Sequence, residues 1–170
     1  STQAKTLFPY TTLFRSGDDY VVVSPKNSGV QRARSLAEYL GSTLAIVDQS
    51  DEYEAGGYVI GDVKGKKCII VDDILNTGQT FVKASKLLTE QDATEIYACA
   101  SHALLCEGAK ADLDAAPIQS ICVTDSCLID DSCKPNVVHY ITCADLMGEA
   151  MKRIQENTPM SPLFRLSIED

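Results

Sequence analysis

Short runs of apolar residues recur along the chain and predict a series of buried strands. Most runs are continuously apolar, and glycine, proline or polar turn residues separate them. Such runs are typical of strands that are covered on both faces of a sheet. The pattern predicts strands at residues 20–24, 43–47, 67–71, 95–101, 120–124 and 137–141, with a weaker, alternating strand at 58–63.

Between these strands, apolar positions repeat with the period of amphipathic helices. They predict helices at residues 30–40, 109–116 and 144–156, and another that starts near Thr80. In the last of these helices, at 144–156, we expect the stripe of Leu146, Ala150 and Ile154 to face inward. Strands that alternate with helices predict an α/β fold, with a mostly parallel sheet and helices on both of its faces. Ligands of such sheets bind beyond the carboxyl ends of the strands.

Composition and net charge limit the kinds of partner that the protein is expected to bind. The 170 residues are 45% hydrophobic and carry a formal net charge of −9. That charge argues against a nucleic-acid backbone or an anionic membrane as the main partner, and no apolar stretch approaches the ~20 residues of a membrane span. The seven cysteines are odd in number and show no C-x-x-C spacing. We interpret them as reduced, mostly buried thiols of a cytoplasmic protein.

The first residues do not fit this pattern. The segment from Thr6 to Ser16 resembles the in-frame translation of a common sequencing adapter, and a native edge strand with a loop is the alternative. We expect residues 1–16 to be non-native or disordered and leave them out of the fold prediction. On this interpretation, the natural segment upstream of Gly17 has been replaced and the chain is a fragment.

The most informative segment joins the strand at 67–71 to the next helix. Two adjacent carboxylates follow the strand, and a polar loop with one glycine leads into the helix. Loop amides and the positive end of a helix suit a phosphate, whereas carboxylates accept hydrogen bonds from sugar hydroxyls or share a metal with them. The alternative is a polar turn with a helix cap. The pattern therefore predicts a site for a phosphorylated ribose at Asp72, Asp73, Asn76, Thr77, Gly78, Gln79 and Thr80.

Each part of this segment has its own chemical role. A glycine at position 78 frees the backbone to approach a phosphate. The hydroxyls of Thr77 and Thr80 are donors, and the helix start adds about half a positive charge. Asp72 and Asp73 are also the candidate ligands for a metal ion.

The segment from Val71 to Thr80 resembles the phosphoribosyl pyrophosphate motif that type I phosphoribosyltransferases share with phosphoribosyl pyrophosphate synthetases. The segments that flank it resemble the synthetases. These are Val21–Pro25, Gly29, Arg32–Arg34, Val59–Lys66, Tyr97–His102, Val123–Ser126 and Met160–Phe164. The resemblance covers residues 18 to about 165 and is to the C-terminal half of ribose-phosphate pyrophosphokinases.

This resemblance implies a type I phosphoribosyltransferase-like fold and an enzyme that works as a cytoplasmic homo-oligomer. The family transfers pyrophosphate from ATP to ribose 5-phosphate with Mg²⁺, which makes phosphoribosyl pyrophosphate for nucleotide biosynthesis. Residues 17–143 would form the domain that binds ribose 5-phosphate, and residues 144–170 would dock on the N-terminal half. Ser161 resembles a tail serine that contacts a regulatory anion.

The chain departs from the family pattern at three places. Lys26 follows Ser-Pro where members commonly carry a metal-binding Asp, and Asn76 stands where many members have Asp. The segment 49–54 is acidic where members usually carry a Lys- and Arg-rich catalytic loop. Because phosphoryl-type transfer relies on cations that clamp the developing charge, we expect a sugar-phosphate site without a complete catalytic centre, and a chain that is inactive alone.

Three functions are compatible with these features. The first is the ribose-5-phosphate half of the pyrophosphokinase, which matches both the motif and its flanks. The second is a non-catalytic regulatory subunit of the synthetase, which Lys26 and the acidic segment favour. The third is a type I phosphoribosyltransferase, which shares the motif and lacks the flanks.

Overall fold

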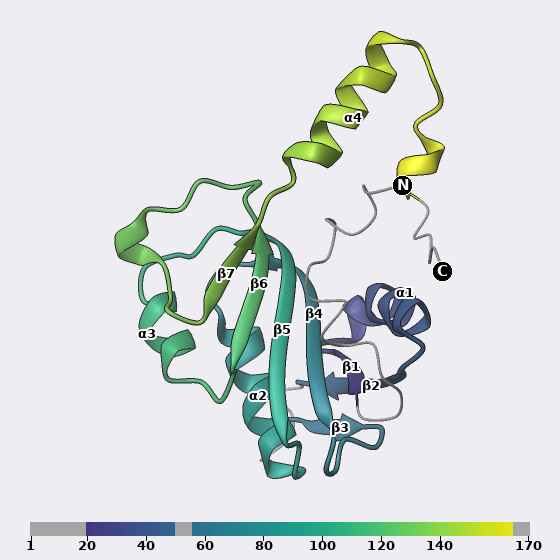
Figure 1. Ribbon diagram of the computed structural model, residues 1–170. Helices are drawn as coiled ribbons and strands as arrows, with labels where there is room; N and C mark the ends of the chain where they lie inside the picture. Colours follow the sequence, from purple (N-terminus) through teal and green to yellow (C-terminus); the bar gives the residue numbers. More distant parts are fainter. Residues whose placement is uncertain (1–19, 50–55, 165–170) are drawn as a thin grey trace.

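A seven-stranded sheet forms the centre of the computed structural model, which describes residues 20–49 and 56–164 (Figure 1). The strand order is β3-β2-β1-β4-β5-β6-β7. Neighbouring strands are parallel except for β2 and β3, which are antiparallel. The strands are β1 (Tyr20–Ser24), β2 (Thr43–Asp48), β3 (Tyr58–Ile60), β4 (Lys67–Leu75), β5 (Glu95–Ala103), β6 (Ser120–Thr124) and β7 (Val138–Ile141). The predicted mostly parallel sheet is confirmed.

Helices cover both faces of this sheet, as predicted. The α-helices are α1 (Val30–Leu40), α2 (Gln79–Glu90), α3 (Ala109–Asp114) and α4 (Ala144–Gln155). The 3₁₀ turns among the described residues are η3 (Asn27–Gly29), η4 (Asp131–Cys133) and η5 (Ser161–Phe164). Because successive side chains of a strand point to opposite faces, Ile69 and Val71 of β4 pack with α1, and Ile70 packs with α2 and α3.

The carboxyl end of β4 extends further than the sequence pattern predicts. The strand continues past Val71 to Leu75, so that both carboxylates lie within it. The reason is the length of β5, which supplies partners as far as Ala103, opposite Leu75. The predicted strand at 58–63 is shorter than expected, since β3 ends at Ile60 and a turn closed by Lys66 N–H and Val63 C=O follows.

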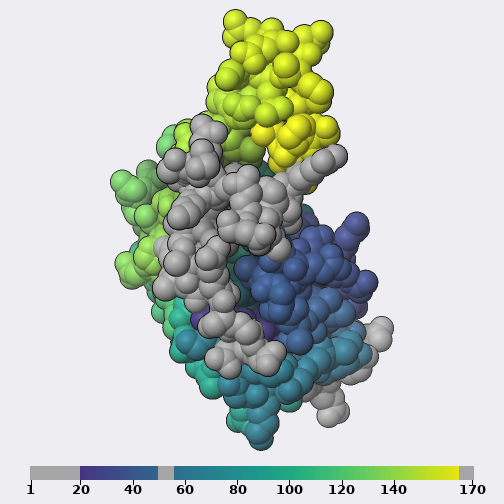
Figure 2. Space-filling view, turned by 45° about the vertical axis from the view of Figure 1, so that its right-hand side comes forward, coloured from purple at the N-terminus to yellow at the C-terminus, as the bar shows by residue number. Residues whose placement is uncertain are grey.

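Helix α4 is an exception to this packing, because none of its residues is buried. It projects from the sheet beyond β7 (Figure 1), and together with η5 it forms a separate lobe in the space-filling view (Figure 2). The prediction that its apolar stripe faces inward is wrong for the described residues, because Ile154 is 69% exposed. Leu146 and Ala150, the other two residues of the predicted stripe, are half-buried.

The cysteines are free thiols, and most of them are less buried than predicted. Only Cys68 is fully buried, and this burial raises its pKa to about 12. Cys106 and Cys133 are exposed. Within the described ranges, the structure contains no helix that is both long and apolar enough to span a bilayer.

Candidate functional site

The candidate site lies at the point where the order of the strands reverses its direction across the sheet. From β1 the chain moves to β2 on one side, and from β4 it moves to β5 on the other, although β1 and β4 are neighbours. The connections that leave their carboxyl ends therefore diverge and open a crevice, which is where α/β sheets bind ligands. Asp72 and Asp73 lie at this end of β4, and Lys26 follows the end of β1.

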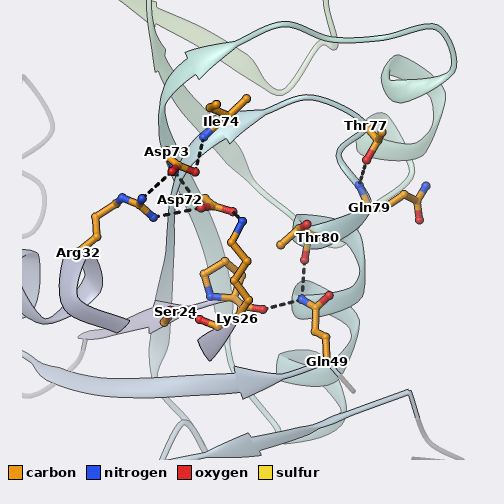
Figure 3. Close-up of polar contacts among 11 residues, drawn as sticks. Ser24, Lys26, Arg32, Gln49, Asp72, Asp73, Ile74, Thr77, Gln79 and Thr80 are labelled. Atoms are coloured by element: carbon orange, nitrogen blue, oxygen red, sulfur yellow. Dashed lines mark hydrogen bonds and ion pairs between the residues drawn. The ribbon is translucent and has the colours of Figure 1, made fainter. Parts of the chain in front are cut away.

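Two cations hold the two carboxylates (Figure 3). Lys26 Nζ lies 2.9 Å from Asp72 Oδ2. Arg32 spans the pair, with Nη1 3.1 Å from Asp72 Oδ1 and Nη2 2.7 Å from Asp73 Oδ2. The side chain of Asp72 is 2% exposed, whereas that of Asp73 is 50% exposed. A carboxylate as buried as Asp72 needs charged partners, since an unpaired buried charge is very costly.

Backbone amides complete the hydrogen bonds of the acid pair. The Asp73 amide donates to Asp72 Oδ1 at 2.9 Å, and the Ile74 amide donates to Asp73 Oδ1 at 3.0 Å. The pKa of the Asp73 carboxyl is lowered, first by its interaction with the neighbouring Asp72 side chain and then by backbone amides and the Arg32 charge. Asp73 therefore stays an acceptor at neutral pH.

The backbone after β1 is shaped to deliver the two cations. Ser24 is buried, and its Oγ donates to the Lys26 carbonyl at 2.7 Å, which fixes the turn that carries the lysine. A Cβ at Gly29 would lie 2.9 Å from Ser24 Oγ and 3.5 Å from Arg32 Nη1. The glycine thus leaves the space through which Arg32, in the first turn of α1, reaches β4.

A small pocket adjoins the acid pair at the start of α2. Its volume is about 70 Å³. Pockets for whole drug-sized ligands measure roughly 300–1,000 Å³, so this one has room for a group such as a phosphate and not for a nucleotide. Its walls are the end of β4 and the loop that follows, and they consist of Asp72, Ile74, Leu75, Asn76, Thr77, Gly78, Thr80 and Phe81.

Gly78 shapes this loop for a reason that the sequence did not predict. Its φ of +77° is left-handed, which favours glycine. In addition, a Cβ here would lie 2.8 Å from Leu113 Cγ of α3. The missing side chain therefore makes room for Leu113 of α3, in addition to the predicted role of letting the backbone approach a phosphate.

Some predicted residues are turned away from the pocket. The side chain of Gln79 donates to Asp112 of α3 at 2.6 Å, and its backbone amide donates to Thr77 Oγ1 at 3.3 Å. Asp73 and Gln79 do not line the pocket, in contrast to the other five predicted residues. Ser161 opens η5 in the lobe beyond α4 and does not line it either.

The structure adds three residues to the predicted set, namely Lys26, Arg32 and Gln49. Gln49 Nε2 donates to the Pro25 carbonyl at 2.8 Å and to the Thr80 carbonyl at 2.9 Å, so it ties the turn after β1 to the first turn of α2 (Figure 3). A polar residue directly after strand β2 was the available signal. The rest of the acidic segment, residues 50–54, lies outside the described residues.

Asp72, as arranged, does not fit a divalent cation. Mg²⁺ takes oxygen ligands in near-octahedral geometry. Here Lys26 and Arg32 contact the oxygens of Asp72 that such an ion would use. Among residues 20–49 and 56–164, no group of three or more His, Cys, Asp or Glu side chains is placed to hold a metal.

Comparison with known proteins places the chain in a family. The family model of the phosphoribosyl synthetase-associated domain matches residues 55–165, about two thirds of the chain. The chain belongs to this family. It is also 61% identical over 152 residues to the Enterococcus faecalis protein named "Putative ribose-phosphate pyrophosphokinase 1", in an alignment that covers 88% of this chain and 47% of that protein. The chain thus spans about half the length of the curated relatives that it matches.

Similarity to solved structures supports the same family. The phosphoribosylpyrophosphate synthetase of Mycobacterium smegmatis superposes with a TM-score of 0.81 at 30% identity, over 91% of this chain and 51% of that chain. The orotate phosphoribosyltransferase of Aeropyrum pernix superposes with a TM-score of 0.56 at 17% identity, over 88% of this chain and 74% of that chain. The second likeness is one of fold alone. Together they confirm the predicted phosphoribosyltransferase-like fold and the family resemblance.

Proposed function

We propose that the chain carries the ribose-5-phosphate-binding half of a ribose-phosphate diphosphokinase. That enzyme transfers pyrophosphate from ATP to ribose 5-phosphate. The observation that carries the proposal is the phosphate-sized pocket between β4 and α2, with an acid pair at its edge. Membership of the phosphoribosyl synthetase-associated family and the similarity to proteins named as pyrophosphokinases support it.

In this proposal, each wall of the crevice binds one part of the substrate. The 5-phosphate occupies the pocket, where the first amides of α2 and the hydroxyls of Thr77 and Thr80 donate to it. The sugar lies toward β4, and its hydroxyls donate to the half-exposed Asp73 carboxylate. ATP, with the Mg²⁺ that accompanies it, approaches from the open side and needs groups that these residues do not supply.

The proposal extends to the organisation of the whole protein. The sheet and helices of residues 17–143 form the substrate-binding domain, and residues 144–170 dock on the N-terminal half that the family carries. Such an enzyme would be a cytoplasmic homo-oligomer, and Ser161 would contact a regulatory anion. The chain alone would bind ribose 5-phosphate without catalysing the transfer.

Calorimetric titration with ribose 5-phosphate tests the substrate. Thr77→Ala removes a donor to a charged phosphate, which is worth about 1.5–3 kcal/mol, so the affinity should fall at least about tenfold. Asp73→Ala should weaken binding by a similar factor, because it removes the acceptor for the sugar hydroxyls. Thr89→Ala, at the far end of α2, is the matched control and should leave affinity unchanged. Equal affinity in all four proteins would exclude this site.

The second candidate is a regulatory subunit that keeps the fold and assembles with active partners. Lys26 beside the buried Asp72 favours it, because this lysine stands where the family resemblance implies a metal ligand. The test joins the chain to a native upstream half and measures phosphoribosyl pyrophosphate formation. Robust turnover by that protein alone would exclude the regulatory function.

A further inference from the structure

The neutralisation of Asp72 is complete within the chain itself. Asp72 Oδ2 contacts Lys26, and Asp72 Oδ1 contacts both Arg32 and the Asp73 amide. The two carboxylates of the acid pair thus face two cations of the protein. The pair needs no metal ion to balance its charge.

This balance matters because Asp72 lines the pocket. An unpaired carboxylate in the wall would repel a phosphate across a short distance, in a partly buried site where water screens charge weakly. With Lys26 on one oxygen and Arg32 on the other, the wall presents a neutral ion-pair cluster instead. An anion can therefore enter the pocket without a divalent cation to shield it.

Lys26 also keeps donors to spare. An ammonium group has three N–H donors, and the contacts of the described residues give Lys26 Nζ one partner, Asp72. Its side chain remains 44% exposed. The turn that carries it is fixed from two sides, by Ser24 Oγ on the Lys26 carbonyl and by Gln49 on the Pro25 carbonyl. A charged group with free donors, paired with a carboxylate that lines the pocket, can bind an oxygen of the ligand.

We propose that Lys26 is a built-in cation that takes the place of a divalent metal at the acid pair, so that this site binds the phosphorylated sugar without metal. The inference rests on the proposed function for the identity of the ligand. Arg32 assists by holding both carboxylates in position. Lys26 acts as a positioning residue toward Asp72 and as a direct ligand toward the sugar phosphate.

Ribose 5-phosphate titrations with excess EDTA and with millimolar Mg²⁺ test the dependence on metal. The wild-type affinity should agree within about twofold between the two conditions. Lys26→Asp places a third carboxylate at the pair, so binding should fall at least about tenfold in EDTA and recover when Mg²⁺ is added. Lys86→Asp makes the same change of charge on the exposed face of α2 and should behave as the wild type does.

A second measurement does not depend on the sugar. Mn²⁺ titration followed by electron paramagnetic resonance should show no ion held by the wild type and about one ion per chain held by Lys26→Asp. Mg²⁺ should likewise raise the melting temperature of Lys26→Asp and not that of the wild type. This shift in melting temperature can be measured even if the variant is destabilised in EDTA. Lys26→Asn, which adds an oxygen ligand without a charge, should give an intermediate response.

The outcomes separate the two proposals. Wild-type binding of ribose 5-phosphate that requires Mg²⁺, or one Mn²⁺ held by the wild type and lost in Asp72→Asn, would overturn the built-in cation. If the wild type binds no ribose 5-phosphate under any condition, the proposed function fails. The Mn²⁺ comparison between wild type and Lys26→Asp then still decides the role of Lys26.

Discussion

Helices α2 and α4 have the same length and the same kind of apolar stripe, yet only one of them is covered. Each contains 12 residues. Six residues of α2 are buried, and none of α4 is. The difference lies in the topology, because α2 connects the neighbouring parallel strands β4 and β5 and must cross a face of the sheet to do so. Helix α4 follows β7, the last strand of the described sheet. It therefore does not have to cross a face of that sheet to reach another strand.

Periodicity therefore predicts which face of a helix is apolar, while the connection decides whether this chain can cover it. On α4 the large apolar residues Met147, Met151 and Ile154 are exposed. Exposed apolar residues that are grouped in this way usually mark a contact surface. This agrees with the proposal that residues 144–170 dock on another part of the whole protein.

The largest effect should come from the buried stripe of α2. Phe81 is 1% exposed, and Phe81→Ala leaves a cavity that should cost about 3–5 kcal/mol of unfolding free energy. Ile154→Ala on α4 should change that free energy by no more than about 0.5 kcal/mol. Urea unfolding followed by circular dichroism measures both. A loss at Ile154 as large as that at Phe81 would mean that the stripe on α4 is covered in solution.

Substitution of one glycine in each region should act with opposite signs. Gly78→Ala meets both a left-handed backbone and Leu113, and should destabilise the protein by about 1–3 kcal/mol. Gly148, inside α4, has open space around the missing side chain. Gly148→Ala should raise helix stability by about 0.5–1 kcal/mol, because alanine restricts the unfolded chain more. Far-UV circular dichroism during thermal unfolding distinguishes these outcomes. If both Gly78→Ala and Gly148→Ala destabilise the protein, the expected difference between the two regions is absent.

The smallest effect concerns the junction between the sheet and α4. Asp125, just beyond β6, accepts a hydrogen bond from the Cys143 amide at the start of α4, at 2.8 Å. This bond, with help from the Cys143 and Thr142 side chains, lowers the Asp125 pKa to about 2 from its ordinary 3.8. The stabilisation is complete above the ordinary pKa and disappears as the pH falls through about 2, because the carboxylate is the form that accepts the bond.

Carbon-13 NMR of the Asp125 carboxyl should therefore show a midpoint near 2. In Asp125→Asn, the amide signals from the first turn of α4 should lose the pH dependence that they show in the wild type in this range. A wild-type midpoint at or above 3.8 would show that the junction does not hold in solution.

Much of the fold was predictable because its signals are local. Continuous apolar runs and the order of acid pair, glycine loop and helix are properties of adjacent residues, and they located β4 and α2. The end of β4 was not predictable, because it depends on the length of β5. The pairing of Arg32 with Asp72 joins residues 40 positions apart and depends on how α1 lies on the sheet. For Gln49 the local signal was only a polar residue after β2, and its two partners, carbonyls on other segments, could not be predicted.

The packing of Leu113 over Gly78 links the proposed sugar-phosphate pocket to a helix from a later part of the chain. The curvature of the loop depends on a leucine that touches no proposed substrate. A bulkier side chain at position 113 would push the loop amides out of alignment, and a smaller one would leave these amides less fixed in position. Selection for substrate affinity should therefore act on α3 as well, and a change at either position would favour a compensating change at the other.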